Sequence, residues 1–219
     1  MRRIILCFSV LLLNSCGGGQ SFDSVKIGYQ EWMLSNLNTS EFQNGEKIFE
    51  AKTAEEWQTA GREERAAWCY YDFNQDNEKL YGKLYNWFAV NDSRGIAPNG
   101  WHISNSKEWN SLSNAVKVDQ SNFTGQAYDC KKSKFNMVSG GRCTSKGIFI
   151  ENEGHSSLAQ GVGDKEPEII GNNGAWWTST ALTGRNSAYS ETISCDGGGG
   201  SWQAVEKGAG FPVRCVKDK

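Results

Sequence analysis

The chain has 219 residues, of which 23 are basic and 25 acidic, so its formal net charge is −2. This balance excludes the strongly basic surface typical of nucleic-acid-binding proteins, and we expect no nucleic-acid partner. Glycine is frequent at 25, tryptophan is frequent at 9 and proline is rare at 3. Such a composition favours a turn-rich domain packed with large rings over a helical bundle.

The N-terminus has the order of a secretory signal. Two arginines precede an apolar run over residues 4–13, which is too short to cross a bilayer because a spanning helix needs about 20 residues. The run ends in Leu-Asn-Ser-Cys, which resembles the lipobox of bacterial lipoproteins. In that family the signal is cleaved before the cysteine, which then carries acyl chains. We expect a signal peptide over residues 1–15 and lipidation of Cys16; the alternative is a soluble secreted protein with a chance cysteine.

A glycine-rich polar stretch follows and predicts a flexible tether over residues 16–24. No second hydrophobic run exists, so the expected membrane contact is through the acyl chains alone. Position 17 is glycine rather than aspartate, which would resemble an inner-membrane retention signal. We therefore expect a lipid-anchored protein of the cell envelope, in the outer membrane.

The first elements of the domain are predicted to be two short strands. Val25, Ile27 and Tyr29 alternate with polar residues, which predicts a half-buried strand. Trp32 and Met33 are expected in a second strand after a turn.

Two helices are predicted from their N-terminal signals. Thr53 and Glu56 form a capping box that opens a helix with Trp57 on one face. A second capping box begins at Asn105, and apolar residues then recur at helical spacing, so a helix is expected over residues 106–117.

The second half of the chain is expected to hold long loops and then antiparallel strands. The order of predicted elements, from short strands through helices and long loops to antiparallel strands, predicts one α+β domain over residues 25–219. In such a domain the helices lie beside a curved sheet. The expected segments are loops over 119–165, strands over 175–180 and 188–194, a glycine turn over 197–200, and closing strands over 202–205 and 211–216.

Five cysteines remain after the predicted processing, and an exported chain can hold disulfides. Cys130 and Cys143 flank a short stretch and are the expected pair by proximity. Cys215 would then pair with Cys195 or with Cys69, which leaves one thiol free. The alternative is that all five are buried, unpaired thiols.

Several segments together are similar to the Fibrobacter succinogenes major paralogous domain, a family of exported proteins and lipoproteins. The resemblance covers residues 25–218 and implies a C-type-lectin-like fold, related to sulfatase-modifying factors: two helices against a twisted antiparallel sheet, with a long irregular loop region. The family's biochemical role is largely uncharacterised. The segments are K-I-G-Y-Q-E-W-M-L-S-N-L (26–37), A-W-C-Y-Y-D (67–72), Y-G-K-L-Y-N-W-F-A-V (81–90), A-P-N-G-W-H-I-S (97–104) with E-W-N-S-L (108–112), A-W-W-T-S-T (175–180) and F-P-V-R-C-V-K-D (211–218).

Aromatic rings in the last strands suggest carbohydrate binding, because sugars pack their apolar faces on such rings. Trp176 and Trp177 point to opposite faces of a strand, so one is expected in the core and the other exposed. The alternative is that these rings only fill the core, as Trp87, Trp101 and Trp109 are expected to do. The candidate stacking residues are Trp177, Tyr189 and Trp202, with Glu151, Asn172, Asn173 and Asp196 as hydrogen-bonding partners.

Metal and catalytic signals are weak. The triplets E-P-N and W-N-D, which are typical of calcium-binding lectins, are absent from the sequence. Residues 166–168 read E-P-E and resemble the first triplet only in part, so the sequence does not support a calcium site. No C-x-x-C exists to suggest zinc. The two histidines, His102 and His155, are the available bases, no G-x-S-x-G motif accompanies them, and His102 is expected to be a structural hydrogen-bonder. We expect no cofactor and no enzymatic activity.

The sequence therefore favours a cell-envelope lipoprotein with a lectin-like, non-catalytic binding domain whose partner is a glycan or an envelope protein. A structural or scaffolding subunit of a surface assembly is the alternative, and an envelope enzyme ranks third.

Overall fold

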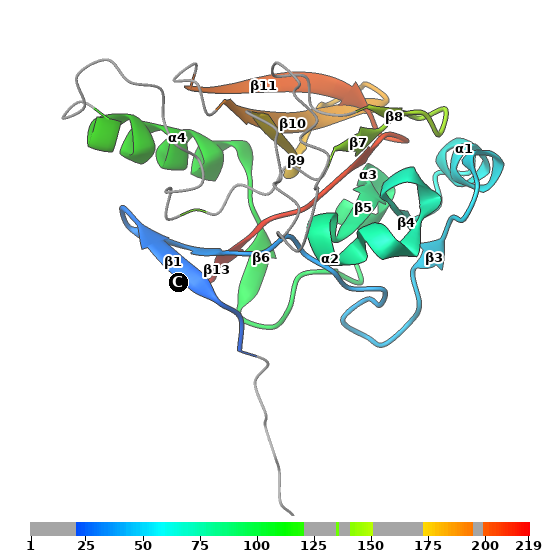
Figure 1. Ribbon diagram of the computed structural model, residues 1–219, viewed down its shortest axis with the longest axis horizontal. Coiled ribbons are helices and arrows are strands. Elements are labelled where there is room, and N and C mark those ends of the chain that lie inside the picture. Colours follow the sequence, from blue (N-terminus) through cyan, green and yellow to red (C-terminus); the bar gives the residue numbers. More distant parts are fainter. Residues whose placement is uncertain (1–20, 121–134, 136–140, 151–172, 195–198) are drawn as a thin grey trace, which may run out of the picture.

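The computed structural model describes residues 21–120, 135, 141–150, 173–194 and 199–219. The described chain is an α+β domain, which confirms the α+β part of the prediction (Figure 1). The elements in chain order are β1 (Ser24–Ile27), β2 (Gln30–Met33), β3 (Phe49–Glu50), α1 (Ala54–Arg62), β4 (Ala67–Tyr70), η1 (Tyr71–Phe73), η2 (Gln75–Asn77), α2 (Glu78–Tyr81), β5 (Lys83–Asn86), α3 (Trp87–Val90), β6 (Trp101–Ile103), α4 (Ser106–Gln120), β7 (Arg142–Cys143), β8 (Phe149–Ile150), β9 (Asn173–Ala181), β10 (Ser187–Ser194), β11 (Gly199–Glu206), β12 (Gly210–Phe211) and β13 (Cys215–Lys217).

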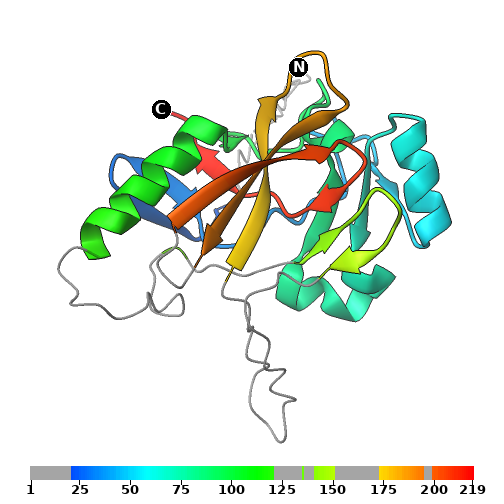
Figure 2. The same cartoon turned by 90° about the horizontal axis from the view of Figure 1, so that it is seen from above.

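The strands form three sheets. Their orders are β1-β2-β13-β6, β11-β10-β9 and β3-β4-β5-β12-β7-β8. Apart from the parallel pair β3–β4, the strand pairs of the described residues are antiparallel. Helix α4 lies between the three-stranded sheet and the β1–β2 hairpin (Figures 1 and 2), so this helix joins two of the three sheets.

Both predicted helix starts are confirmed by their hydrogen bonds. Thr53 caps α1 and accepts a hydrogen bond from the Glu56 amide at 3.2 Å. Asn105 Oδ1 accepts from the Glu108 amide at 3.1 Å, while Glu108 Oε2 accepts from the Asn105 amide at 2.9 Å. This reciprocal pair is a capping box, which satisfies backbone donors that a helix start otherwise leaves open.

Three boundary predictions need correction. Tyr29 lies in the hairpin turn rather than in a half-buried strand. The predicted tether is too long, because Asp23 O already accepts a hydrogen bond from the Leu34 amide and Ser24 belongs to β1. The glycine turn is too long at its far end, since Gly199 pairs with Ser194 at the start of β11.

The core is divided into aromatic clusters on either side of β9. One cluster lies under α4 and contains Trp32, Trp109 and Trp176. The Trp109 and Trp176 rings are stacked with centroids 5.2 Å apart. A second, larger cluster lies on the opposite side of β9 and includes Trp177 and Phe211. Both faces of β9 are therefore covered by side chains.

A buried arginine joins the elements around the first cluster. The Arg214 side chain is fully buried, although nothing in the sequence marks it as a core residue. It donates to the carbonyls of Met33 at 2.9 Å and Phe135 at 3.3 Å, and through Nη2 to Asn36 Oδ1 at 2.9 Å. The same Asn36 oxygen accepts from Trp176 Nε1 at 2.9 Å. Buried polar groups that satisfy one another in this way hold neighbouring segments in a single arrangement.

Candidate functional site

The structure contradicts the prediction of an exposed Trp177. This side chain is fully buried, its ring centroid lies 4.8 Å from that of Phe211, and its Nε1 donates to the Tyr85 carbonyl at 2.8 Å. Trp176 is equally buried on the other face of the strand. The prediction failed because it assumed that one face of β9 meets solvent, whereas both faces are packed.

The other two predicted stacking residues do lie together. Tyr189 on β10 and Trp202 on β11 have ring centroids 5.1 Å apart in an edge-to-face arrangement. Trp202 is 60% exposed, whereas Glu191, opposite it on β10, is 1% exposed. Burial raises the pKa of the Glu191 carboxyl to about 7. The surface around Trp202 thus combines one widely exposed ring, the partly exposed ring of Tyr189 and a buried carboxyl on the neighbouring strand.

The side chains of the predicted hydrogen-bonding partners of Tyr189 and Trp202 are not described by the structure. Glu151, Asn172 and Asp196 lie outside the described residues, and Asn173 is described only as the first backbone position of β9.

The predicted disulfides also fall partly outside the described residues. Cys69, Cys143 and Cys215 are buried free thiols, while Cys130 and Cys195 are not described. The pairing of Cys130 with Cys143 and that of Cys215 with Cys195 stay predictions.

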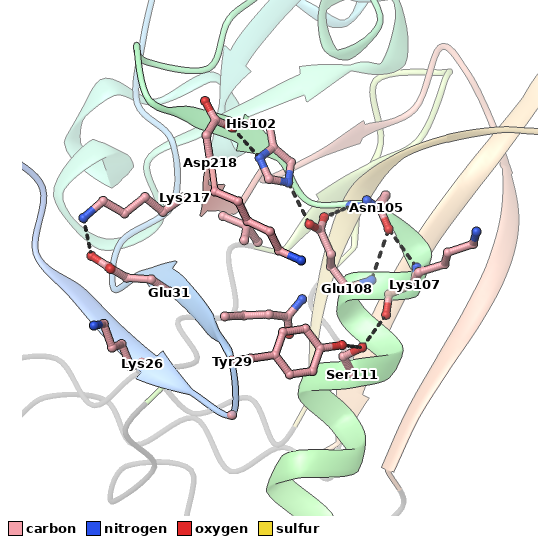
Figure 3. A pocket seen from close by; sticks show the side chains of 14 residues that line it. Lys26, Tyr29, Glu31, His102, Asn105, Lys107, Glu108, Ser111, Lys217 and Asp218 are labelled. Carbon is pink, nitrogen blue, oxygen red and sulfur yellow. Dashed lines mark hydrogen bonds and ion pairs between the residues drawn. The ribbon is translucent and has the colours of Figure 1, made fainter.

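A cleft that the sequence did not indicate lies beside α4. It has a volume of about 680 Å³ and is formed by the β1–β2 hairpin, β6, the start of α4 and the segment from β13 to the C-terminal residue (Figure 3). Its polar and charged lining comes from segments nearly 200 residues apart in sequence: Lys26, Tyr29, Gln30, Glu31, His102, Asn105, Lys107, Glu108, Ser111, Lys217, Asp218 and Lys219.

Tyr29 presents an aromatic ring to this cleft. It follows Gly28, whose φ of 60° allows the two-residue turn between Ile27 and Gln30. The Tyr29 side chain is 75% exposed. Its hydroxyl lies 2.8 Å from Ser111 Oγ, and Ser111 in turn donates to the Lys107 carbonyl at 3.0 Å, so Tyr29 is the donor to Ser111. The hydrogen bond fixes the direction of the ring, and the Lys219 ammonium lies over the ring, 5.7 Å from its centroid.

His102 lies on β6 between two carboxylates. Its Nε2 is 2.7 Å from Glu108 Oε1 and its Nδ1 is 2.7 Å from Asp218 Oδ1. Burial alone would lower the pKa of the imidazole, but hydrogen bonding and charge from Glu108 and Asp218 outweigh burial and raise the pKa of His102 above its ordinary value. This confirms the prediction of a hydrogen-bonding role and adds a protonatable group to the cleft.

The cleft carries more basic than acidic side chains. Glu31 is paired with Lys217 at 2.9 Å, and hydrogen bonds from Lys217 and Ser24 lower the pKa of the Glu31 carboxyl. Within the described ranges, Lys26, Lys107 and Lys219 form no ion pair. The positive charge of these side chains favours an anionic ligand, and Lys219 in addition makes the cation–π contact to the Tyr29 ring.

The polar side chains of the cleft bond mainly to one another and to the backbone. Ser111 bonds to Tyr29 and to a backbone carbonyl, while His102 faces carboxylates, so the cleft holds no serine–histidine pair of the kind that nucleophilic catalysis uses. Over the residues that the structure describes, no three His, Cys, Asp or Glu side chains are grouped to hold a metal ion. Residues 166–168, which resemble part of a calcium-binding triplet, lie outside the described residues. In the same described part of the chain, no helix is long and apolar enough to cross a membrane.

Sequence reasoning missed Tyr29, Glu31 and Asp218 as residues of one site. The Gly28-Tyr29 pair between two alternating runs was the available signal, since glycine followed by another residue is typical of two-residue hairpins. No local signal could show that the chain end returns to this hairpin.

Comparison with known proteins gives one match. The sequence model of the Fibrobacter succinogenes major domain matches residues 25–217. Searches of curated proteins and of solved structures gave no match.

Proposed function

The chain belongs to the Fibrobacter succinogenes major domain family, and we propose that it is a lipid-anchored, non-catalytic binding protein of the cell envelope. In this proposal the cleft beside α4 binds an anionic saccharide. The observation that carries this proposal is the combination of an exposed tyrosine ring with lysines that form no ion pair among the described residues, around one concave surface. Tyr29 offers a face on which a sugar ring can pack. Lys26, Lys107 and Lys219 would bind the carboxylate, sulfate or phosphate groups of that sugar.

The fold supports a binding role. Two longer helices, α1 and α4, lie beside mostly antiparallel sheets, which supports the proposal that the domain is C-type-lectin-like. In that arrangement the sheets hold the cleft residues in fixed positions. Binding therefore needs no ordering of the backbone around Tyr29 and His102, which lowers the entropic cost of association.

The anchor would hold this cleft close to the membrane. The fold already includes Phe22, which packs edge-to-face on Trp101, so the tether after Cys16 is only residues 17–21. Five extended residues reach roughly 17 Å. The domain would thus sit near the outer membrane and meet glycans of the envelope.

Replacing the lipidation site tests the anchor. We expect Cys16→Ser to move the protein from the membrane pellet to the soluble fraction, because no acyl chain can then be attached. Fractionation with immunoblotting measures this, with Cys215→Ser as a cysteine control that should stay in the pellet. A Cys16→Ser protein that remains membrane-bound contradicts the lipoprotein assignment.

Binding to a glycan panel tests the function. We expect uronate-, sulfate- or phosphate-bearing glycans to bind and neutral glucans, mannans and xylans to fail, with binding that weakens at high salt because the lysines act by charge. Tyr29→Ala should weaken binding roughly tenfold, equivalent to about 1.4 kcal/mol. Trp202→Ala, which removes the other exposed ring, is the matched control and should bind normally. If Trp202→Ala loses binding while Tyr29→Ala retains it, the ligand occupies the β10–β11 surface and the cleft assignment is wrong.

The same assay has a pH arm. Protonated His102 adds positive charge between Glu108 and Asp218, and, although burial lowers its pKa, hydrogen bonds to these carboxylates raise the pKa above the ordinary value. Affinity for the anionic glycan is therefore greatest at low pH, where His102 is protonated, and falls as the pH rises through the pKa of His102. The fall should be absent in His102→Gln, whose side chain does not titrate.

A scaffolding role is the second candidate, favoured by one observation. β11 is an edge strand of its sheet and carries the exposed Trp202. An unpaired edge can accept a strand from another protein. Co-purification of a stoichiometric envelope partner that is lost on Trp202→Ala, together with a glycan panel without binders, would favour this role.

A further inference from the structure

Two cysteines far apart in sequence lie in one buried cluster. Cys69 on β4 and Cys143 on β7 are 0% and 1% exposed and share a cluster with Trp57, Ala60 and Leu84. The β7–β8 turn is held against α1, because Trp57 Nε1 donates to the Thr144 carbonyl at 3.1 Å. Figure 2 shows this hairpin beside α1.

β4 and β7 belong to one sheet with β5 and β12 between them, and the segments next to the two cysteines pack closely against each other. The Tyr71 ring lies so near Gly141 that an added Cβ there would be 2.3 Å from Tyr71 Cε2. The Tyr71 ring also packs on Phe149, the strand partner of Cys143, with centroids 5.1 Å apart. Cys69 precedes Tyr71 by two residues and Cys143 follows Gly141 by two, so this contact lies close to both cysteines along the chain.

The two thiols share one buried cluster. Burial, and beyond it a hydrogen bond and charge from Cys143, raise the pKa of the Cys69 thiol well above its ordinary value. Cys143 Sγ donates to the Thr144 carbonyl at 3.4 Å. Cys215 belongs to a different cluster, so it is not a third member of this pair.

We propose that Cys69 and Cys143 form a disulfide in the exported protein. The predicted export to an oxidising compartment makes this chemistry available. An Sγ–Sγ bond forms as the two thiols release two protons and two electrons, and the electrons reduce the disulfide of an exported thiol oxidoreductase to a dithiol through a mixed-disulfide intermediate. Because the folded pair is buried and its thiolate disfavoured, oxidation takes place during folding, before α1 and the β7–β8 hairpin close over the sulfur atoms.

The bond would join the two ends of the domain's middle segment. It links β4 to the β7–β8 hairpin across residues 70–142, a long loop whose closure restricts the unfolded chain strongly. The proposal gives Cys143 a partner other than Cys130, so the two pairings exclude each other.

Peptide mapping of the full-length protein under non-reducing conditions tests the proposal. The protein is exported with its own leader and, in parallel, the purified chain is refolded in a glutathione redox buffer, so that failure of export and failure of pairing give different results. After acid quenching, alkylation and trypsin, we expect peptide 66–79 linked to peptide 143–146, with the mass of two hydrogens lost. Recovery of both peptides alkylated in the refolded sample, or a link from 143–146 to the Cys130 peptide 118–131, would overturn it.

Variants add a stability readout. The double variant Cys69→Ala, Cys143→Ala should have a thermal midpoint lower by roughly 10 °C than the oxidised wild type. The thermal midpoint of this double variant should equal that of the reduced wild-type protein. The control variant Cys215→Ala should keep the disulfide link between peptides 66–79 and 143–146. A reduced wild type that melts with the oxidised protein would contradict the proposal.

Discussion

Trp177→Ala is expected to lower the free energy of unfolding by roughly 4 kcal/mol, since deleting a buried tryptophan leaves a cavity and loses its transfer energy. The ring is fully buried against Phe211, and its indole donates to the Tyr85 carbonyl, which would lose that partner. Chemical denaturation measures the change.

Trp202→Ala is the matched control for that variant. It removes the same side chain from a position that is 60% exposed, so a change below about 1 kcal/mol is expected. If Trp177→Ala were as stable as wild type, Trp177 would not be a core residue and its role as an exposed sugar-stacking ring would be open again.

The second large effect is expected at Arg214. Arg214→Ala leaves the Met33 and Phe135 carbonyls and the Asn36 side chain without the hydrogen bonds that the guanidinium gives them. Each buried acceptor left unsatisfied costs about 1–3 kcal/mol, so a loss of roughly 4 kcal/mol or complete unfolding is predicted. Arg214→Lys should recover little, because one ammonium cannot reproduce the planar fork that reaches these separate acceptors.

Denaturant unfolding with an exposed arginine as control measures this effect. Arg185 lies in the turn between β9 and β10 and is exposed, so Arg185→Ala should change stability by less than about 0.5 kcal/mol. Equal stability of Arg214→Ala and Arg185→Ala would show that the buried network does not hold the first core cluster together.

Local signals in the sequence predicted the elements well because their causes are local. Thr53 with Glu56, and Asn105 with Glu108, cap α1 and α4 through hydrogen bonds that span only three residues. The strands around Trp177 and Tyr189 followed from short apolar patterns.

Burial could not be predicted in the same way. Whether Trp177 meets solvent depends on β12, more than 30 residues later, and Arg214 becomes a core residue only because Met33, Asn36 and Phe135 surround it. Polar type and exposure are linked only on average, so a buried arginine has no local signature.

The candidate site was missed for a related reason. Tyr29, His102 and Asp218 come from three separate elements, and only the pairing of β13 with both β2 and β6 brings them together. The prediction from sequence instead relied on the many aromatic residues of the last strands. Among the described residues of those strands, Trp202 is the one widely exposed ring.

The most direct test of the proposed function is a chemical-shift map of unlipidated Cys16→Ser protein titrated with the tightest-binding anionic glycan of the panel. We predict that the amide signals of Tyr29, His102, Ser111 and Lys217 shift together while the indole signal of Trp202 does not, and that a neutral glycan of the same length shifts none of them. Shifts centred on Trp202 and Tyr189, or equal shifts with the neutral glycan, would contradict an anionic-saccharide site in the cleft beside α4.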